Sequence, residues 1–169
     1  MYRQLTVAVA QGTAHTNSQT EGSLARHTFA AHSLQPGKSY PISGACIVSD
    51  NNSTDTLTLA LRFGASTTPG SNTPVVSTAA IDSADGDAGM FMGYMTVRSV
   101  GTAGVVVIHG VICQADAIGV GTTPTFGFVK VITGVDTTAP LYLDYTADWS
   151  VAHAENIVAA EAFILVETV

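Results

Sequence analysis

Charged side chains are scarce in this chain of 169 residues. Lys, Arg, Asp and Glu make up 11% of it, against about 25% in an ordinary globular domain, and Thr, Ser, Ala and Gly take their place. A surface with so few charges tends to associate with other molecules. The length suits a single domain over residues 1–169, large enough to bury roughly 70% of its unfolded surface. We therefore expect one domain that contacts other protein over much of its surface.

Basic residues are the scarcest charges, with six Lys and Arg against thirteen Asp and Glu and a net charge of −7. This balance disfavours a nucleic acid or an anionic membrane as a partner. Long apolar runs are also missing, since no window approaches the ~20 residues of a membrane-spanning helix. The start of the chain resembles a signal peptide, but its apolar part is short and alternates like a strand. We expect the chain to begin at or near Met1 and to be made in a cytoplasm.

Cysteine is limited to two residues, Cys46 and Cys113, and each lies in an apolar strand pattern. The pattern favours free thiols that pack as small hydrophobic side chains. A disulfide would need Cα atoms within ~7 Å of each other, and sequence alone leaves that alternative open.

Helical periodicity is almost absent, and alternation dominates instead. The clearest case runs from Asn51 to Gly64, where Leu57, Leu59, Leu61 and Phe63 share one parity. Side chains of a strand point alternately to its two faces, so this stretch predicts a strand with one buried face. The polar residues before it favour a turn.

The remaining windows predict further strands separated by Gly, Pro, Asn and Asp turns. We expect them near residues 5–9, 23–31, 40–49, 75–81, 90–100, 105–114, 126–133, 141–149 and 157–168. Pro41 predicts an edge strand or the first residues of a strand, and residues 35–38 predict a type II turn. Residues 105–114 are apolar on both parities, which suits a strand covered on both faces or a subunit interface. Residues 151–156 could hold a brief helical turn.

This pattern predicts an all-β fold. We expect a jelly-roll β-sandwich of roughly eight to ten antiparallel strands with little or no helix. An immunoglobulin-like sandwich is disfavoured because the Cys…Trp…Cys spacing is missing.

Candidate metal ligands are few. None of the five histidines has the sequence spacing of metal ligands. His15, His27 and His32 nevertheless bracket one turn and could meet in space. His109 is expected to be a core or interface residue. Three acids gather in one turn, at positions Asp82, Asp85 and Asp87. They fail the EF-hand pattern, so we expect a solvated acidic turn, and an irregular calcium site stays open.

No catalytic motif is present. The chain has no phosphate-binding loop, no nucleophile elbow and no recognisable pair of glycosidase carboxylates. Trp149 follows Asp148 and could stack on a sugar, although a lone Trp is more often a core or interface plug. We expect no enzyme activity, no cofactor and no metal.

Three segments together resemble a known family. They are residues 10–25, with G-T-A-H-T-N-S; residues 52–64, with N-S-T-D-T-L-T-L; and residues 136–152, with D-T-T-A-P-L-Y-L-D-Y-T-A-D-W-S, followed by the closing E-x-F-I-L-V-E. They resemble small jelly-roll decoration or cement proteins of tailed bacteriophages, including those of cyanophages. The match is weaker over residues 65–127.

The resemblance implies a structural protein of the virion. Such a protein binds the major capsid protein on the capsid exterior, often as a homotrimer, and stabilises the shell. Candidate contacts with the shell or with sister subunits are Leu5, Val7, Val9 and Trp149. Edge strands would supply unpaired backbone groups for such contacts, and several weak contacts would add by avidity.

The alternative function is a receptor- or carbohydrate-binding head of a phage fibre or spike. It would use the same fold, with the loops at residues 65–74 and 115–123 as its binding face.

Overall fold

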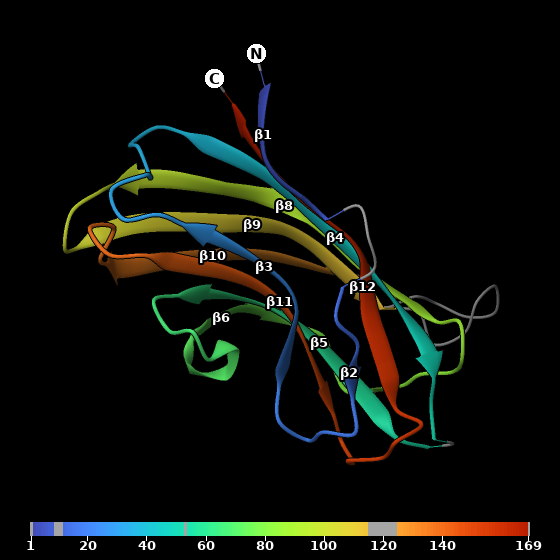
Figure 1. Ribbon diagram of the computed structural model, residues 1–169. Coiled ribbons are helices and arrows are strands. Elements are labelled where there is room, and N and C mark those ends of the chain that lie inside the picture. The colour runs from blue at the N-terminus through green and yellow to red at the C-terminus, as the bar shows by residue number, and fades with distance from the viewer. Residues whose placement is uncertain (1, 9–11, 53, 115–124, 169) are drawn as a thin grey trace.

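In the computed structural model the chain folds into two antiparallel sheets packed face to face (Figure 1). The structure describes residues 2–8, 12–52, 54–114 and 125–168, and only the backbone of residues 2–8, 125, 126 and 168. In this part the elements are β1 (Tyr2–Ala8), β2 (His15–Thr16), β3 (Gly22–Phe29), β4 (Ser39–Asp50), β5 (Thr56–Gly64), the 3-10 turn η1 (Pro69–Ser71), β6 (Thr73–Ser77), β7 (Ile81–Asp82), β8 (Ala88–Ser99), β9 (Gly104–Gln114), β10 (Thr125–Val135), β11 (Leu141–Trp149) and β12 (Ile157–Thr168).

The strand order is that of a jelly roll with an addition. The large sheet runs β1-β12-β4-β8-β9-β10, with β2 beside β12, and the small sheet runs β3-β11-β5-β6, with β7 beside β5. Leaving out β2, β7, β9 and β10, the eight remaining strands pair in the order first-eighth-third-sixth and second-seventh-fourth-fifth. This interleaving of early and late strands defines two Greek keys. The strands β9 and β10 therefore extend the large sheet beyond the eight-stranded arrangement.

The predicted all-β jelly-roll sandwich is confirmed, with twelve strands in the described ranges where roughly eight to ten were expected. Several local predictions are confirmed with it. The hairpin over residues 101–104 joins β8 to β9, and residues 35–38 turn with Gly37 at φ 79° and a hydrogen bond from Lys38 N to Gln35 O. Pro41 is the third residue of β4, which is a central strand. The prediction that Pro41 lies among the first residues of a strand is therefore confirmed, and the alternative, an edge strand, is wrong. The strand expected over residues 75–81 is in fact two short strands, β6 and β7.

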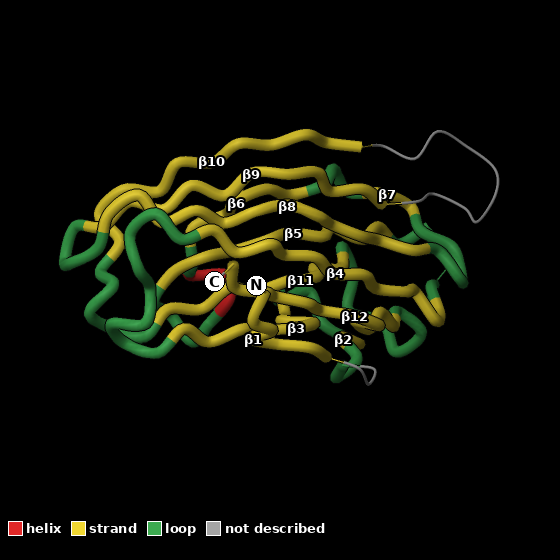
Figure 2. Tube along the Cα trace, turned by 90° about the horizontal axis from the view of Figure 1, so that it is seen from above, coloured by secondary structure: helices red, strands yellow, loops and turns green. Residues whose placement is uncertain are grey.

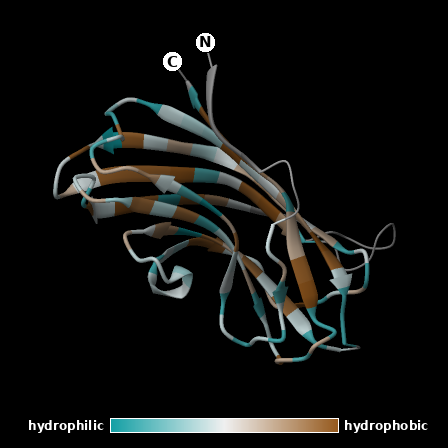
Figure 3. Ribbon diagram, in the orientation of Figure 1, coloured by the Kyte–Doolittle hydropathy of each residue, from teal (hydrophilic) through white to brown (hydrophobic). Residues whose placement is uncertain are grey.

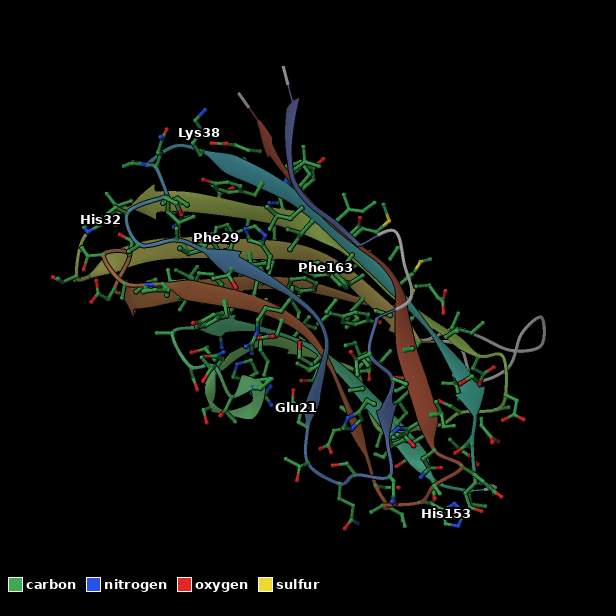
Figure 4. All side chains as sticks on the ribbon, viewed as in Figure 1. Glu21, Phe29, His32, Lys38, His153 and Phe163 are labelled. Atoms are coloured by element: carbon green, nitrogen blue, oxygen red, sulfur yellow. The ribbon has the colours of Figure 1, made fainter. Side chains whose placement is uncertain are left out.

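The core forms where the alternating side chains of β5 meet the inner face of the large sheet. Leu57, Leu59, Leu61 and Phe63 are each at most 1% exposed. Phe29 from β3 and Phe163 from β12 point into the space between the sheets, where both are buried (Figure 4). The predicted buried stripe of β5 is therefore confirmed.

Two glycines on the inner face of the large sheet allow the sheets to approach closely. A Cβ on Gly44 would overlap the ring of Phe91, and a Cβ on Gly89 would overlap Leu59 and lie 3.0 Å from Cys46 Sγ. The missing side chains make room for large neighbours, so Leu59 packs directly against the sheet backbone.

No helix in the described ranges has the length and hydropathy needed to cross a membrane.

The close approach at Gly89 predicts a stability effect. Gly89→Ala should lower the free energy of unfolding by about 1–3 kcal/mol, because the added methyl group has no space in the packed core. The matched control is Gly127→Ala, since a Cβ at Gly127 meets nothing within 4 Å, and it should change stability by less than about 0.5 kcal/mol. Urea unfolding of the two variants measures the difference. Equal midpoints would show that the core adapts without cost.

Candidate functional site

The outer face of the small sheet is closed by a polar layer from its own chain. Asp144 on β11 is 0% exposed and accepts hydrogen bonds from Arg26 Nε at 2.7 Å, Arg26 Nη2 at 3.1 Å and Ser23 Oγ at 2.9 Å. Arg26 also lies over the ring of Tyr142, 4.7 Å from its centroid. A bidentate pair with a further donor satisfies a buried carboxylate, so this face has its partners within the chain.

A second ion pair holds the loop after β5 against the same face. Arg62 donates to Glu21 Oε1, which also accepts a hydrogen bond from the Thr146 hydroxyl, and Arg62 Nη1 donates to Asn72 O at 3.0 Å. Asn72 in turn bonds both the N–H and the C=O of Ser66. The loop at residues 65–74, one of the two loops considered for receptor binding, is thus tied down by side chains beneath it.

The outer face of the large sheet has the opposite character, because its apolar side chains are exposed. Along β8, β9 and β10 the side chains largely alternate between core and solvent, and both sets include many apolar residues. Hydrophobic residues colour much of these strands brown in Figure 3. Six exposed side chains form what we call the outer patch: Met90, Met92, Tyr94, Val111, Val129 and Val131. Val129 is 75% exposed and Met92 58%.

Strand register makes the outer patch continuous. Met92 lies opposite Val111, and Tyr94 lies opposite His109, which itself lies opposite Val129. Directly opposed residues of antiparallel strands share a face and lie side by side. Side chains of this size, about half exposed, give an apolar area on the order of 500 Å², at the upper end of what monomeric proteins expose.

The outer patch contains an open groove of about 620 Å³. Its lining comes from β8, β9 and β10 and includes Met92, Tyr94, Val111 and Val129. The floor of the groove is open at Gly127, because this residue lies opposite Val111 and has no side chain to fill the space. A smaller hollow of about 260 Å³ continues the apolar surface across β4 to Ile164 and Val166 of β12.

One aromatic pair stands in this groove. The rings of Tyr94 and His109 are stacked, with centroids 5.7 Å apart and planes at 23°. Tyr94 is 49% exposed, and His109 is exposed beside it. The prediction of a buried core position for His109 is therefore wrong, because the residue lies on the outer parity of β9; its alternative, an interface position, remains a prediction.

Half of the outer patch lies on β8 and half on the two strands that extend the jelly roll. Only β8 belongs to the eight-stranded arrangement, whereas β9 and β10 are additions to it. The inner parity of these strands supplies core residues such as Ile108 and Ile112, each 0% exposed. The outer parity supplies little to the core, Val107 of β9 being buried at 7% exposure, so folding alone does not require its exposed positions to be apolar.

The four contacts predicted from the sequence lie elsewhere. Leu5 and Val7 belong to β1, which pairs with β12 of the same chain and leaves its other side as an edge of the large sheet. Val9 lies outside the described residues. Trp149 is 1% exposed and packs in the core. The prediction that it contacts the shell or a sister subunit is therefore wrong, and the alternative, a core position, is correct.

The histidines and acids considered as metal ligands do not form a ligand set. No group of three or more His, Cys, Asp and Glu side chains gathers suitably among the described residues. His32 and His153 lie at opposite ends of the sandwich (Figure 4).

The acidic turn is solvated at two of its three acids, as expected, since Asp82 and Asp85 are exposed and Asp87 is buried. Asp87 is 1% exposed and accepts a hydrogen bond from Ala84 N at 2.7 Å, and Asp85 accepts one from Asn51 N at 2.9 Å. Asp82 pairs with Thr56 at the end of β5. Asp87 therefore holds a backbone N–H group of its own turn and Asp85 holds that of Asn51, just after β4, which is a structural use of their carboxylates.

The two cysteines are free, as predicted. Cys46 lies on the inner face and its Sγ is 3.1 Å from the hydroxyl of Tyr145, whereas Cys113 lies on the outer parity opposite Met90. Residues on opposite faces of a sheet, with β8 between them, cannot form a disulfide.

Comparison with known proteins finds no matching family model, no matching curated protein and no matching solved structure. The resemblance to phage decoration proteins therefore stays a prediction.

Sequence reasoning missed most of the outer patch, although one signal for it was present. The apolar double parity of residues 105–114 pointed to a second covered face or an interface. The patch residues of β8 were harder to recognise, because Met90, Met92 and Tyr94 alternate with core residues and give no contrast between parities.

The different positions of the thiols predict different reactivity. Burial raises the pKa of Cys46 to about 11, and the thiol is 2% exposed, so it should not react with a water-soluble disulfide reagent while the chain is folded. Cys113 is partly exposed and should react in the folded chain, slowly because burial also raises its pKa. Peptide mapping after labelling at pH 8, with and without denaturant, identifies each thiol. Equal labelling of both in the folded chain would contradict this geometry.

Two histidines predict that stability falls on acidification. Burial lowers the pKa of His15, against the opposing charges of Asp148 and Glu21, and burial also lowers the pKa of His27. The unfolded chain then takes up protons near pH 6.5 before the folded chain does, so the free energy of unfolding decreases as the pH falls below that value.

Urea midpoints at pH 7.5 and pH 5.5 test this dependence. The parent chain should be less stable at pH 5.5, and the double variant His15→Asn, His27→Gln should lose less stability over the same step. An unchanged difference in the double variant would mean that other groups cause the pH dependence.

Proposed function

We propose that this protein is a structural, non-catalytic component of a tailed-bacteriophage virion that binds the capsid exterior and stabilises the shell. The observation that carries the proposal is the exposed outer patch on β8 and on the two strands added to the jelly roll. An apolar patch at the upper end of what monomers expose is often functional, which supports a protein-binding role. The sequence resemblance to capsid decoration proteins supplies the identity of the partner, the major capsid protein.

The binding mechanism in this proposal is adhesion over area. The outer patch removes apolar side chains from water when it meets a complementary shell surface, at roughly 25 cal/mol per Å² buried. One patch on the order of 500 Å² falls short of the ~800 Å² that each partner buries in a standard interface. Several copies bound together would compensate by avidity, in keeping with the trimer that the resemblance implies.

The contrast between the two outer faces supports this orientation. The small sheet carries the paired charges of Arg26, Asp144, Arg62 and Glu21, which are already satisfied. A face with satisfied polar groups suits water, and an exposed apolar face suits protein. The large sheet would therefore face the shell and the small sheet the solvent.

A second candidate function is carbohydrate binding by a fibre or spike head. Tyr94 favours it, because an exposed tyrosine in an open groove can stack on a sugar ring. Copy number separates the candidates: a decoration protein is present in hundreds of copies per particle, and a fibre head in a few tens or fewer. A glycan array with specific hits would favour the second candidate.

The shell-binding proposal predicts the effect of charge on the outer patch. The double variant Met92→Asp, Val129→Asp should rebind stripped particles of the encoding phage at least about tenfold more weakly, because two carboxylates would be desolvated at the interface. Its thermal midpoint should match that of the parent, since both side chains are exposed. The matched control, Val151→Asp, changes an exposed valine outside the outer patch and should rebind normally.

Co-sedimentation with the particles measures rebinding, and DNA release on heating or osmotic shock measures shell stability. Stripped shells should release DNA at lower temperature and recover when the parent chain is added back. Shells that are equally robust without the chain would contradict the proposal.

A further inference from the structure

The strand β10 is the longest edge strand in the described part of the chain. It spans eleven residues and ends the large sheet, and no described strand of this chain pairs with its other side. In Figure 2 it runs along one border of the molecule, beyond β9. The edge strand β6 of the small sheet has five residues and contains Pro74, and β3, at that sheet's other edge, has eight. Both β3 and β10 contact strands of the opposite sheet, β12 and β6 respectively, so length is what distinguishes β10. Short strands and proline blunt an edge, whereas a long apolar edge invites pairing.

The side chains of β10 protect this edge at one position, Lys130, because an inward-pointing charge is among the features that blunt an edge. Lys130 is its one charged residue, and it points to the inner parity, opposite Ile108. On the outer parity Val129 and Val131 are exposed at 75% and 48%. An unpaired strand edge presents alternating backbone N–H and C=O groups, whose chemical complement is another extended strand.

We propose that β10 pairs antiparallel with β10 of a second copy of this chain, about a two-fold axis close to Val129. The two large sheets then become one continuous sheet across the dimer. An isologous contact of this kind needs a strand that is complementary to itself.

The sequence of β10 meets that requirement in the register centred on Val129. Val129 meets its own copy, Val131 meets the bare backbone of Gly127, and Lys130 meets Phe128. A large side chain thus lies beside a missing one, and a cation lies beside an aromatic ring. The register centred on Lys130 would place two like charges opposite each other, which disfavours it.

The area of the outer patch is in keeping with a second copy at this edge, which the self-complementary sequence of β10 favours. Paired residues of an antiparallel sheet face the same side, so the two outer patches would join across the dimer axis. Two patches on the order of 500 Å² each exceed the ~800 Å² that one side of a standard interface buries, whereas one patch does not. This step rests on the proposed shell-binding function. The contact joins two copies only, so a trimer would need a further surface.

The test uses the purified chain without any shell, so its failure is distinct from failure of the shell-binding proposal. Sedimentation equilibrium of the parent up to about 100 µM should show a monomer–dimer equilibrium. Val129→Lys places two lysines opposite each other at the axis and should raise the dimer dissociation constant at least about tenfold. Val151→Lys, an exposed valine outside both β10 and the outer patch, should leave it unchanged.

Cysteine variants test the geometry, in a Cys113→Ser background. Val129→Cys should form a covalent dimer on mild oxidation, because directly opposed Cα atoms in antiparallel strands lie within disulfide range. Val111→Cys is the matched control on the same face of β9 and is too far from the axis to reach its copy.

Three results would overturn the proposal. These are a monomer over the whole concentration range, an oligomer that is insensitive to Val129→Lys, and cross-linking through Val111→Cys, which would indicate that the two faces stack on each other. A trimer without an edge contact would appear as the second of these results.

Discussion

The fit between β5 and the large sheet is the constraint on which the rest of the structure depends. Four apolar side chains on one parity of β5 fill the space between the sheets, and Leu59 reaches the large sheet where Gly89 leaves room. Protein interiors are packed at the density of organic crystals, so this contact sets how closely the sheets approach. The spacing fixed there decides which residues of β4, β8 and β12 face the core and, by alternation, which face outward.

The two outer faces use the small supply of charge very unequally. Two of the six basic residues, Arg26 and Arg62, are bound to carboxylates over the small sheet and hold the segments around Glu21 and Asn72 in place. The large sheet also carries charges, such as the exposed Arg98 of β8 and Glu161 of β12. Between them, the outer patch is a surface of methionine, valine and tyrosine without a charged side chain of its own.

Fold class was accessible from the sequence because alternation and turn chemistry are local signals. The stripe of Leu57 to Phe63, the turn at Gly37 and the hairpin at residues 101–104 each depend on neighbouring residues only. The strand order was not accessible in the same way, because β1 pairs with β12 at the far end of the chain. Length and strand number favoured a jelly roll, but they could not show that β9 and β10 extend one sheet.

The candidate site was predicted less well, for a related reason. Trp149 stood out as the single tryptophan of the chain, yet a large aromatic side chain gains most from burial and lies in the core. The residues of the outer patch are ordinary hydrophobic residues, which a sequence pattern assigns to the interior. Only the position of β8, β9 and β10 in the sheet shows that one of their two apolar parities has no second layer of protein above it.

The separation of parities along β9 and β10 has an evolutionary consequence. Folding constrains Ile108 and Ile112, because both are buried in the core. Val111 and Val129 are constrained instead by the molecule that contacts the exposed face. Substitutions on the second set leave the packed interior untouched. Binding partners could therefore change in evolution through substitutions at the exposed, alternate residues of β9 and β10, while the core residues that stabilise the fold stay the same.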